Sequence, residues 1–235
     1  MADPEAQPEL DELLAEQQRY YRARATTYRY GAPDPGSEPQ AEQVIRELEA
    51  AIAEHIHGDV AELACGPGTW TGMLARAADS VTALDGSPEM LRIAAATEPG
   101  VNVRFAEADI FGWRPERRYD CVFFGFWLSH VPEERFDAFW QTVADALTPG
   151  GTVLFVDDGY RGAEELVYGT DSSVIERRGH DGSAFRIIKV ALRAERLAQQ
   201  LTGLGWEVEM YDRDPFVWGI ASRGSAPAPS PPGSA

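Results

Sequence analysis

The sequence predicts an α/β fold in which a mostly parallel sheet is covered by helices on both faces. Two observations carry this prediction. Between residues 59 and 156, short apolar segments of about five residues alternate with segments whose apolar residues recur at helical spacing. The first apolar segment, Asp59-Val60-Ala61-Glu62-Leu63, also runs into a glycine turn, which is typical of a strand that leads into a helix in such sheets.

Composition and charge narrow the class of ligand. The 235 residues carry 38 acidic and 21 basic side chains, which gives a net charge of −17. This charge repels polyanions, so we expect a small-molecule substrate and no nucleic-acid or membrane partner. No apolar run has membrane length and the N-terminus is acidic, so we expect a cytoplasmic protein, whereas oligomeric state is not indicated. Cys65 and Cys121 fall in predicted buried segments, and no metal-ligand cluster accompanies them.

The chain divides into one domain over residues 10–222 with flexible ends. Residues 1–9 are acidic and contain two prolines, and residues 223–235 are rich in Pro, Ser and Ala, so we expect both to be disordered. Residues 10–57 should form N-terminal helices, the first over 10–25 and the second with one apolar face built on Val44, Leu48 and Ile52. Four tyrosines near the end of the first helix either pack it onto the domain or form a lid: Tyr20, Tyr21, Tyr28 and Tyr30.

The glycine turn predicts a nucleotide cradle. Gly66 and Gly68 allow the backbone to turn sharply and to approach a ligand closely. The dinucleotide fingerprint requires a third small glycine, where this chain has Thr71. Glu62 lies just ahead of the glycines, where its charge suits a ligand that carries an ammonium and a sulfonium better than a diphosphate.

Two further carboxylates follow the next predicted strands. Asp85 ends the strand 80–84, about twenty residues after the glycine turn, where an acid can accept both ribose hydroxyls. Its alternative role is a helix cap, which Ser87 and Pro88 already fill. Asp109 follows the strand 101–106 and could accept from an adenine amino group while Ile110 covers the ring; the alternative is an acidic surface loop.

The second half of the sheet begins with the strands 120–124 and 152–156. His130 follows the first of these, on the cofactor side, and is either a general base or a histidine bonded to backbone. Residues 160–191 then interrupt the alternation of strands and helices with a predicted β-hairpin, in which Asp181-Gly182 forms the turn between the strands 174–178 and 185–190. A helix (192–204) and the strands 206–211 and 216–222 complete the domain.

With these positions in register, residues 20–222 resemble the class I S-adenosylmethionine (SAM) methyltransferases. The resemblance implies a Rossmann-like seven-stranded sheet whose last strand is antiparallel. It places Glu62 near the methionine moiety, Asp85 on the ribose and Asp109 on the adenine. The cofactor set that we expect is Tyr20, Tyr28, Glu62, Ala64, Gly66, Gly68, Trp70, Asp85, Gly86, Met90, Asp109, Ile110 and Phe126.

A closer likeness is carried by four segments: Tyr20 to Ala25, Val81 to Ser87, Trp127 to Pro132 and Phe185 to Val190. They are similar to the phosphonate O-methyltransferases of dehydrophos biosynthesis and their actinobacterial relatives. That resemblance implies that a hairpin arginine, a hairpin lysine and an N-terminal tyrosine hold the acceptor. These would be Arg177 or Arg178, Lys189 and Tyr30, with His130 nearby. The hairpin cations could also be solvated surface residues, although Arg178 and Lys189 could meet across the hairpin.

The sequence therefore predicts methyl transfer from SAM to a small molecule, with an acidic acceptor held by cations and no proton removed. A neutral hydroxyl or amine acceptor would need His130 as a base. Other classes remain open, namely a SAM-binding protein that transfers no methyl group, a nicotinamide oxidoreductase and a nucleic-acid methyltransferase. Thr71 and Glu62 argue against the oxidoreductase, and the net charge and Gly125-Phe126-Trp127 argue against the nucleic-acid enzyme.

Overall fold

The computed structural model describes residues 6–25, 38–158 and 161–224. Its centre is a seven-stranded sheet in the order β3-β2-β1-β4-β5-β9-β8. The strands are β1 (Asp59–Leu63), β2 (Ser80–Asp85), β3 (Val103–Glu107), β4 (Tyr119–Gly125), β5 (Leu147–Asp158), β8 (Trp206–Arg213) and β9 (Phe216–Arg223). The first five are parallel, and β9 pairs antiparallel with both β5 and β8. The predicted fold class is confirmed.

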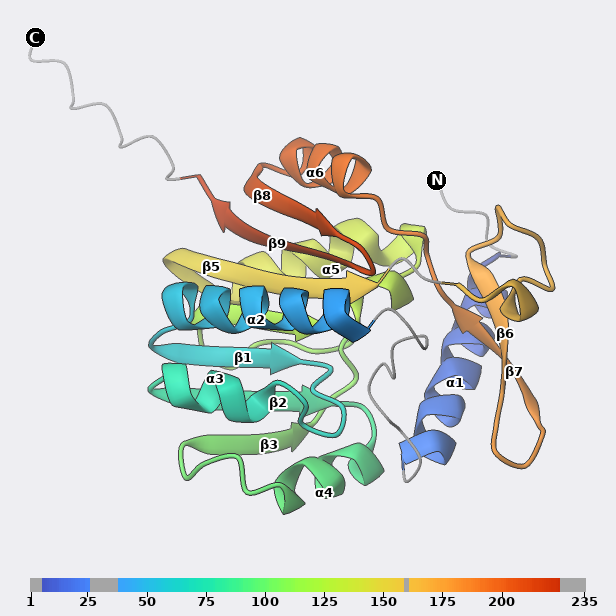
Figure 1. Cartoon of the computed structure of the whole chain (residues 1–235), viewed down its shortest axis with the longest axis horizontal. Coiled ribbons are helices and arrows are strands. Elements are labelled where there is room, and N and C mark those ends of the chain that lie inside the picture. The colour runs from blue at the N-terminus through green and yellow to red at the C-terminus, as the bar shows by residue number, and fades with distance from the viewer. Residues whose placement is uncertain (1–5, 26–37, 159–160, 225–235) are drawn as a thin grey trace, which may run out of the picture.

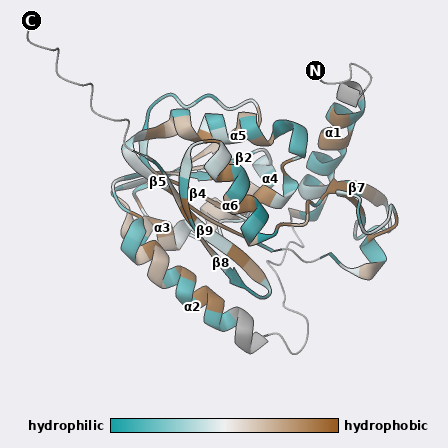
Figure 2. Cartoon of the chain, turned by 90° about the horizontal axis from the view of Figure 1, so that it is seen from above, coloured by the Kyte–Doolittle hydropathy of each residue, from teal (hydrophilic) through white to brown (hydrophobic). Residues whose placement is uncertain are grey.

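Helices cover both faces of the sheet, as Figures 1 and 2 show. One face carries α2 (Glu38–His55), α3 (Thr71–Ala77) and α4 (Pro88–Ala96), and the other carries α5 (Glu133–Ala146) and α6 (Ala194–Gly203). Two short 3₁₀ turns, η2 (Leu128–His130) and η3 (Ala163–Glu165), complete the loops. The central strands are buried on both sides, which explains their continuous apolar sequence.

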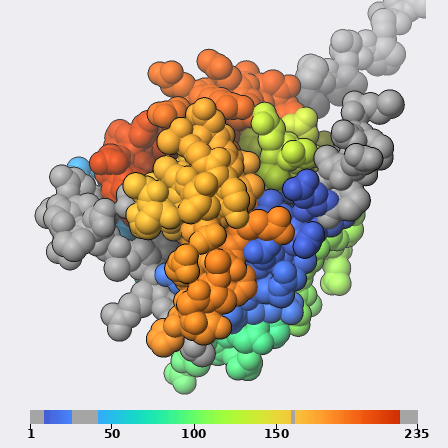
Figure 3. Space-filling view, turned by 90° about the vertical axis from the view of Figure 1, so that its right-hand side faces the viewer, coloured from blue at the N-terminus to red at the C-terminus, as the bar shows by residue number. Residues whose placement is uncertain are grey.

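A separate layer lies across the carboxyl ends of the parallel strands. It consists of α1 (Ala6–Arg24) and a two-stranded sheet of β6 (Val174–Arg178) and β7 (Ala184–Ile188), which lie side by side (Figures 1 and 3). Glu16 of α1 accepts hydrogen bonds from the backbone N and the Nε of Arg186, at 2.7 and 2.8 Å. Tyr20, Ile175 and Ile187 form a small apolar core between the helix and the hairpin. We call this layer the lid.

Several boundaries differ from the sequence prediction. The first helix begins at Ala6 rather than near residue 10, because Pro8 is tolerated in a first turn, where backbone N–H groups have no helical partner. β5 begins at Leu147 rather than at residue 152. The second helix packs on the sheet through Val44, Leu48 and Ile52, as the sequence predicts. Arg223, predicted to begin the disordered tail, is the last residue of β9.

Some predictions concern residues outside the described ranges. These are the site roles of Tyr28 and Tyr30 and the disorder expected for residues 1–5 and 225–235. Within the described part, no helix combines the length and the apolar character needed to cross a membrane. Both cysteines are buried there and neither forms a disulfide.

Candidate active site

A cavity of about 420 Å³ lies between the lid and the carboxyl ends of the parallel strands. Its floor is built by the ends of β1, β2 and β4 and by the loop after β3, which contribute Ala64, Gly66, Asp85, Asp109, Ile110 and Phe126. Its roof is α1, which contributes Leu14, Gln17, Gln18 and Tyr21. Open parallel sheets bind ligands at this edge, so the cavity is the candidate active site.

The glycine turn has the backbone geometry that the sequence predicts. Gly66 and Gly68 have φ angles of +55° and +86°, in the region that favours glycine. A Cβ atom at Gly66 would meet no atom of the described residues within 4 Å, so these residues leave open space there for a ligand. At Gly68 a Cβ atom would lie 3.0 Å from Cβ of Ala94, so this glycine lets the turn pack closely against α4. Gly66 therefore faces the cavity, whereas Gly68 has a packing role.

Glu62 lies behind the glycine turn and is 1% exposed. Thr71 Oγ1 donates to its Oε2 at 2.7 Å, and Oε1 has no hydrogen-bond partner among the described residues. Burial raises the pKa of Glu62 to about 8; the Thr71 hydrogen bond opposes this rise, and the Asp85 charge adds to it. A buried carboxyl group with one unpaired oxygen is suited to a nearby cationic ligand.

Asp85 ends β2 and lines the cavity. Its Oδ2 accepts from Gly66 N and its Oδ1 from Ser87 N, both at 2.8 Å. Burial raises the pKa of Asp85, although these two backbone hydrogen bonds partly oppose the rise. The hydroxyl of Ser87 accepts from Met90 N at 3.2 Å, which confirms Ser87 as the cap of α4. The carboxylate of Asp85 is therefore held in a fixed orientation at the cavity wall, with lone pairs left for two ligand hydroxyls.

The loop after β3 forms one end of the cavity. Asp109 is exposed at its rim and accepts from Phe111 N at 3.2 Å, while Ile110 is buried and gives an apolar wall. The guanidinium of Arg135 lies 5.3 Å from the ring centre of Phe111 and pairs with Asp11 of α1 at 2.5 Å. A flat ligand ring bound between Ile110 and Phe111 would have the carboxylate of Asp109 beside its edge.

The loop after β4 forms the opposite side of the cavity, beyond β1. Phe126 has a φ angle of +58°, and its N–H donates to Val156 O at 2.7 Å. Its ring stacks on Trp70 with centroids 6.4 Å apart. Gly125 is required here, because a Cβ atom at this position would lie 2.6 Å from Nε1 of Trp70. This contact fixes where Phe126 enters the cavity.

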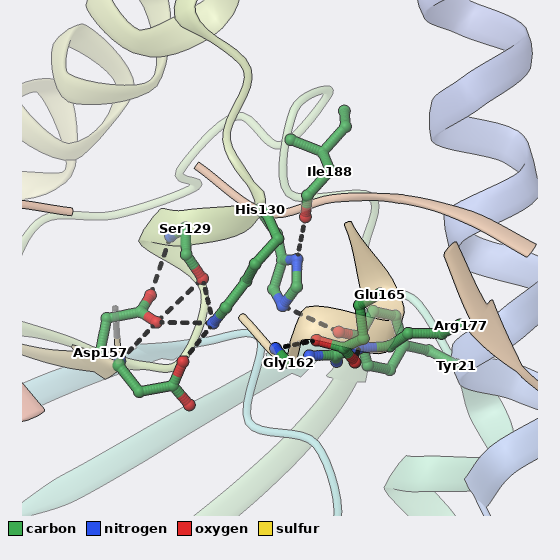
Figure 4. Close-up of polar contacts among 10 residues, drawn as sticks. Tyr21, Ser129, His130, Asp157, Gly162, Glu165, Arg177 and Ile188 are labelled. Carbon is green, nitrogen blue, oxygen red and sulfur yellow. Dashed lines mark hydrogen bonds and ion pairs between the residues drawn. The ribbon is translucent and has the colours of Figure 1, made fainter. Parts of the chain in front are cut away.

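His130 lies at the end of η2, 5% exposed, and links both parts of the lid to the sheet (Figure 4). Its Nδ1 lies 2.5 Å from Ile188 O of β7, and its Nε2 lies 2.8 Å from the Tyr21 hydroxyl of α1. Burial lowers the pKa of His130 well below its usual value, and the charges of Lys189 and Arg177 lower it further. The imidazole is therefore neutral at pH 7, and both nitrogens are engaged.

The two arginines of β6 have different surroundings. Arg177 is mostly buried beside Tyr21, and its Nε donates to Glu165 Oε1 at 2.7 Å. Burial alone would lower the pKa of Arg177, but Tyr21 and Glu165 outweigh it and raise the pKa. The side chain of Arg178 is 71% exposed and pairs with Glu176.

The expected meeting of Arg178 and Lys189 across the hairpin is wrong. Arg178 pairs with Ala184, and Lys189 lies beyond the end of β7. Lys189 is 2% exposed and turns toward the sheet. Its Nζ donates to Ser129 Oγ at 2.9 Å and lies 3.5 and 2.5 Å from carboxylate oxygens of Asp157 and Asp158.

The cavity wall contains many of the residues that the sequence singled out, namely Ala64, Gly66, Asp85, Gly86, Met90, Asp109, Ile110, Phe126 and His130. Glu62, Gly68 and Trp70 lie behind this wall, Tyr20 lies in the lid core, and Arg177 and Lys189 flank His130. Tyr21 was predicted only as a packing or lid tyrosine, and Gln17 was given no role. Their spacing with Leu14 along one face of α1 was the signal that could have found them. Among the described residues no group of His, Cys, Asp and Glu could hold a metal ion.

Comparison with known proteins agrees with this architecture. A family model described as a methyltransferase domain matches residues 60–151. The structure of DhpI in complex with SAH is 40% identical, with a TM-score of 0.75 over 91% of this chain and 98% of that chain. The chain belongs to the class I SAM-dependent methyltransferases. DhpI in complex with SAM and HEP is 39% identical, with a TM-score of 0.76 over 89% and 97% of the two chains.

A curated relative matches over a shorter stretch. This trans-aconitate 2-methyltransferase of Streptomyces avermitilis is 40% identical over 104 residues, and the match spans only 37% of its length. The protein described here uses SAM as its methyl donor. The cavity fits this cofactor, because Gly66 leaves room for it, Asp85 offers oxygens to two hydroxyls, and Glu62 keeps an unpaired buried oxygen.

SAM supplies an electrophilic methyl group, so the protein's tasks are binding, alignment and exclusion of water. Asp85 and the Ile110 loop are the groups available to the nucleoside. The sheet order places them on one side of β1 and His130 on the other. The methyl acceptor is therefore expected between Phe126, Tyr21 and His130, under the lid.

Proposed function

We propose that this methyltransferase O-methylates an acidic small molecule, a phosphonate or a carboxylate. The observation that carries the proposal is the state of His130, whose two nitrogens are both engaged in hydrogen bonds. A neutral alcohol or amine would have to lose a proton during transfer, whereas an ionised acid already offers a lone pair. An acceptor that needs no base suits a site whose histidine is occupied.

Two buried cations support the same class of acceptor. Arg177 and Lys189 lie close enough to His130 for their charges to lower its pKa. Each is balanced by carboxylates in the described residues, Arg177 by Glu165 and Lys189 by Asp157 and Asp158. We propose that the acid group of the acceptor binds at this end of the cavity and competes with Glu165 for Arg177. DhpI, a phosphonate O-methyltransferase similar over most of this chain, supports the phosphonate as the first acid to test.

The test compares Arg177→Gln with the matched control Arg178→Ala in methyl transfer from labelled SAM to a phosphonate. We expect Arg177→Gln to raise KM for the phosphonate on the order of tenfold or more, because a hydrogen bond to a charged group is worth roughly 1.5–3 kcal/mol. The Kd for SAM should be unchanged in both variants. A KM equal to that of the wild type in a folded Arg177→Gln protein would contradict this placement of the acid group.

His130 separates this function from the alternative. If a proton had to be removed, His130→Gln would lower kcat strongly and change the basic limb of the pH profile. For an acidic acceptor we expect a smaller loss, and an unchanged pH profile above the pKa of the acceptor itself. A large loss of kcat with a shifted profile would favour a hydroxyl or amine acceptor.

A further inference from the structure

The adjacent residues Tyr20 and Tyr21 of α1 have different surroundings. Tyr20 is 2% exposed, packs with Ile175 and Ile187, and accepts from Arg24. Tyr21 lies on the face of α1 that forms the cavity roof, with its ring edge-on to His130 at a centroid distance of 5.4 Å. A tyrosine hydroxyl in a ligand cavity is positioned to act on chemistry as well as on packing.

The directions of the hydrogen bonds around His130 follow from its partners. The carbonyl oxygen of Ile188 can only accept, so Nδ1 carries the proton and donates to it. A neutral imidazole then has its lone pair on Nε2, so the Tyr21 hydroxyl donates to Nε2. The hydrogen bond to Ile188 thus selects the tautomer of His130 that a general base needs, and the Tyr21 hydroxyl is hydrogen-bonded to its basic nitrogen, Nε2.

We propose that Tyr21 is a specificity-determining residue: it caps the Nε2 lone pair of His130 and so prevents the methyltransferase from deprotonating neutral hydroxyl acceptors. This inference rests on the proposed function, in which the natural acceptor is an acid. His130 is the only histidine among the described residues that line the cavity. Capping its lone pair leaves the acceptor end without an imidazole base.

Removal of the cap has a defined chemical consequence. In Tyr21→Phe the ring stays beside His130 and only the hydroxyl is lost, so Nε2 gains access to the cavity. For a phenol, the oxygen lone pair would form the bond to the methyl carbon while the carbon–sulfur pair stays on sulfur. The phenolic proton would move to Nε2 of His130, so the step balances without another reactant.

The experiment measures methyl transfer from labelled SAM to two matched acceptors, phenylphosphonate and phenol. The variants are Tyr21→Phe, Tyr21→Phe combined with His130→Gln, and the control Tyr211→Phe, which removes a hydroxyl from β8 away from the cavity. We expect the ratio of kcat/KM for phenol to that for phenylphosphonate to rise at least tenfold in Tyr21→Phe. The ratio should return to the wild-type value in the double variant and stay unchanged in Tyr211→Phe.

A measurement on the ligand-free protein tests the cap directly. The ¹⁵N spectrum of the wild type should show His130 with Nδ1 protonated and Nε2 unprotonated and hydrogen-bonded, and the Nε2 resonance should move downfield in Tyr21→Phe. A protonated Nε2 in the wild type would overturn the inference, as would an unchanged acceptor ratio in Tyr21→Phe or a gain that survives loss of His130. Failure of the proposed function is distinct, because wild-type protein would then prefer phenol to phenylphosphonate.

Discussion

The stability of this protein is expected to decline as the pH rises from about 4.5 to 8, and replacing Glu62 with glutamine should remove most of that decline. Burial raises the pKa of Glu62 from 4.5 to about 8 in the folded state. Between these values the folded protein keeps a proton that the unfolded chain has lost, so the free energy of unfolding falls as the pH rises. Each pH unit is worth about 1.36 kcal/mol, so the full window corresponds to on the order of 5 kcal/mol.

The assay is urea unfolding at pH 5, 6.5 and 8 for the wild type, Glu62→Gln and the control Glu107→Gln. Glu107 is an exposed residue of β3 and should leave the slope unchanged. Glutamine keeps the shape of the protonated carboxyl group, so Glu62→Gln should be close to the wild type at pH 5 and more stable than it at pH 8. Parallel curves for all three proteins would refute the assignment of a buried, protonated Glu62.

Three further perturbations have expected outcomes. Lys189→Met should lower the free energy of unfolding by roughly 3–5 kcal/mol at pH 7, because it leaves buried Asp157 without its cation. The loss should be smaller at pH 5, since burial already raises the pKa of Asp157 and removal of the lysine raises it further. An equal loss at both pH values would contradict this. Gly125→Ala should lower stability by about 1–3 kcal/mol through collision with Trp70, and an unchanged Tm would show that the loop yields. Asp85→Ala should weaken SAM binding at least about tenfold in calorimetry, because two ligand hydroxyls would lose their hydrogen bonds to a charged carboxylate. An unchanged Kd would remove this residue from the site.

The half of the cavity around the glycine turn could be predicted from sequence because its signals are local. The glycine turn, Asp85 and Ile110 each follow a strand within a few residues, and the parallel sheet brings strand ends together automatically. The structure places Gly66 and Asp85 in direct contact, as that logic requires. Glu62 could be predicted as an acid near the turn, but its burial behind the turn depends on packing against α3.

The half around Tyr21 and His130 was not predictable in the same way, because contacts between distant segments build it. Glu16 and Arg186 join α1 to the hairpin across 170 residues, and nothing local in either segment indicates the partner. Tyr20 and Tyr21 are neighbours in sequence, and only the docking of α1 decides which one enters the cavity. The strand register of the hairpin determines the position of Lys189, which lies beyond the paired residues of β6 and β7 and points inward to Asp157.

We propose that this methyltransferase acts on an acceptor that needs no deprotonation. The most direct test is a competition in which wild-type protein and labelled SAM meet equal concentrations of phenylphosphonate, benzoate, phenol and benzylamine at pH 7. We expect the label to enter a methyl ester of the phosphonate or the carboxylate, at a kcat/KM at least tenfold above that for phenol or benzylamine. Preferential labelling of phenol or benzylamine would contradict it.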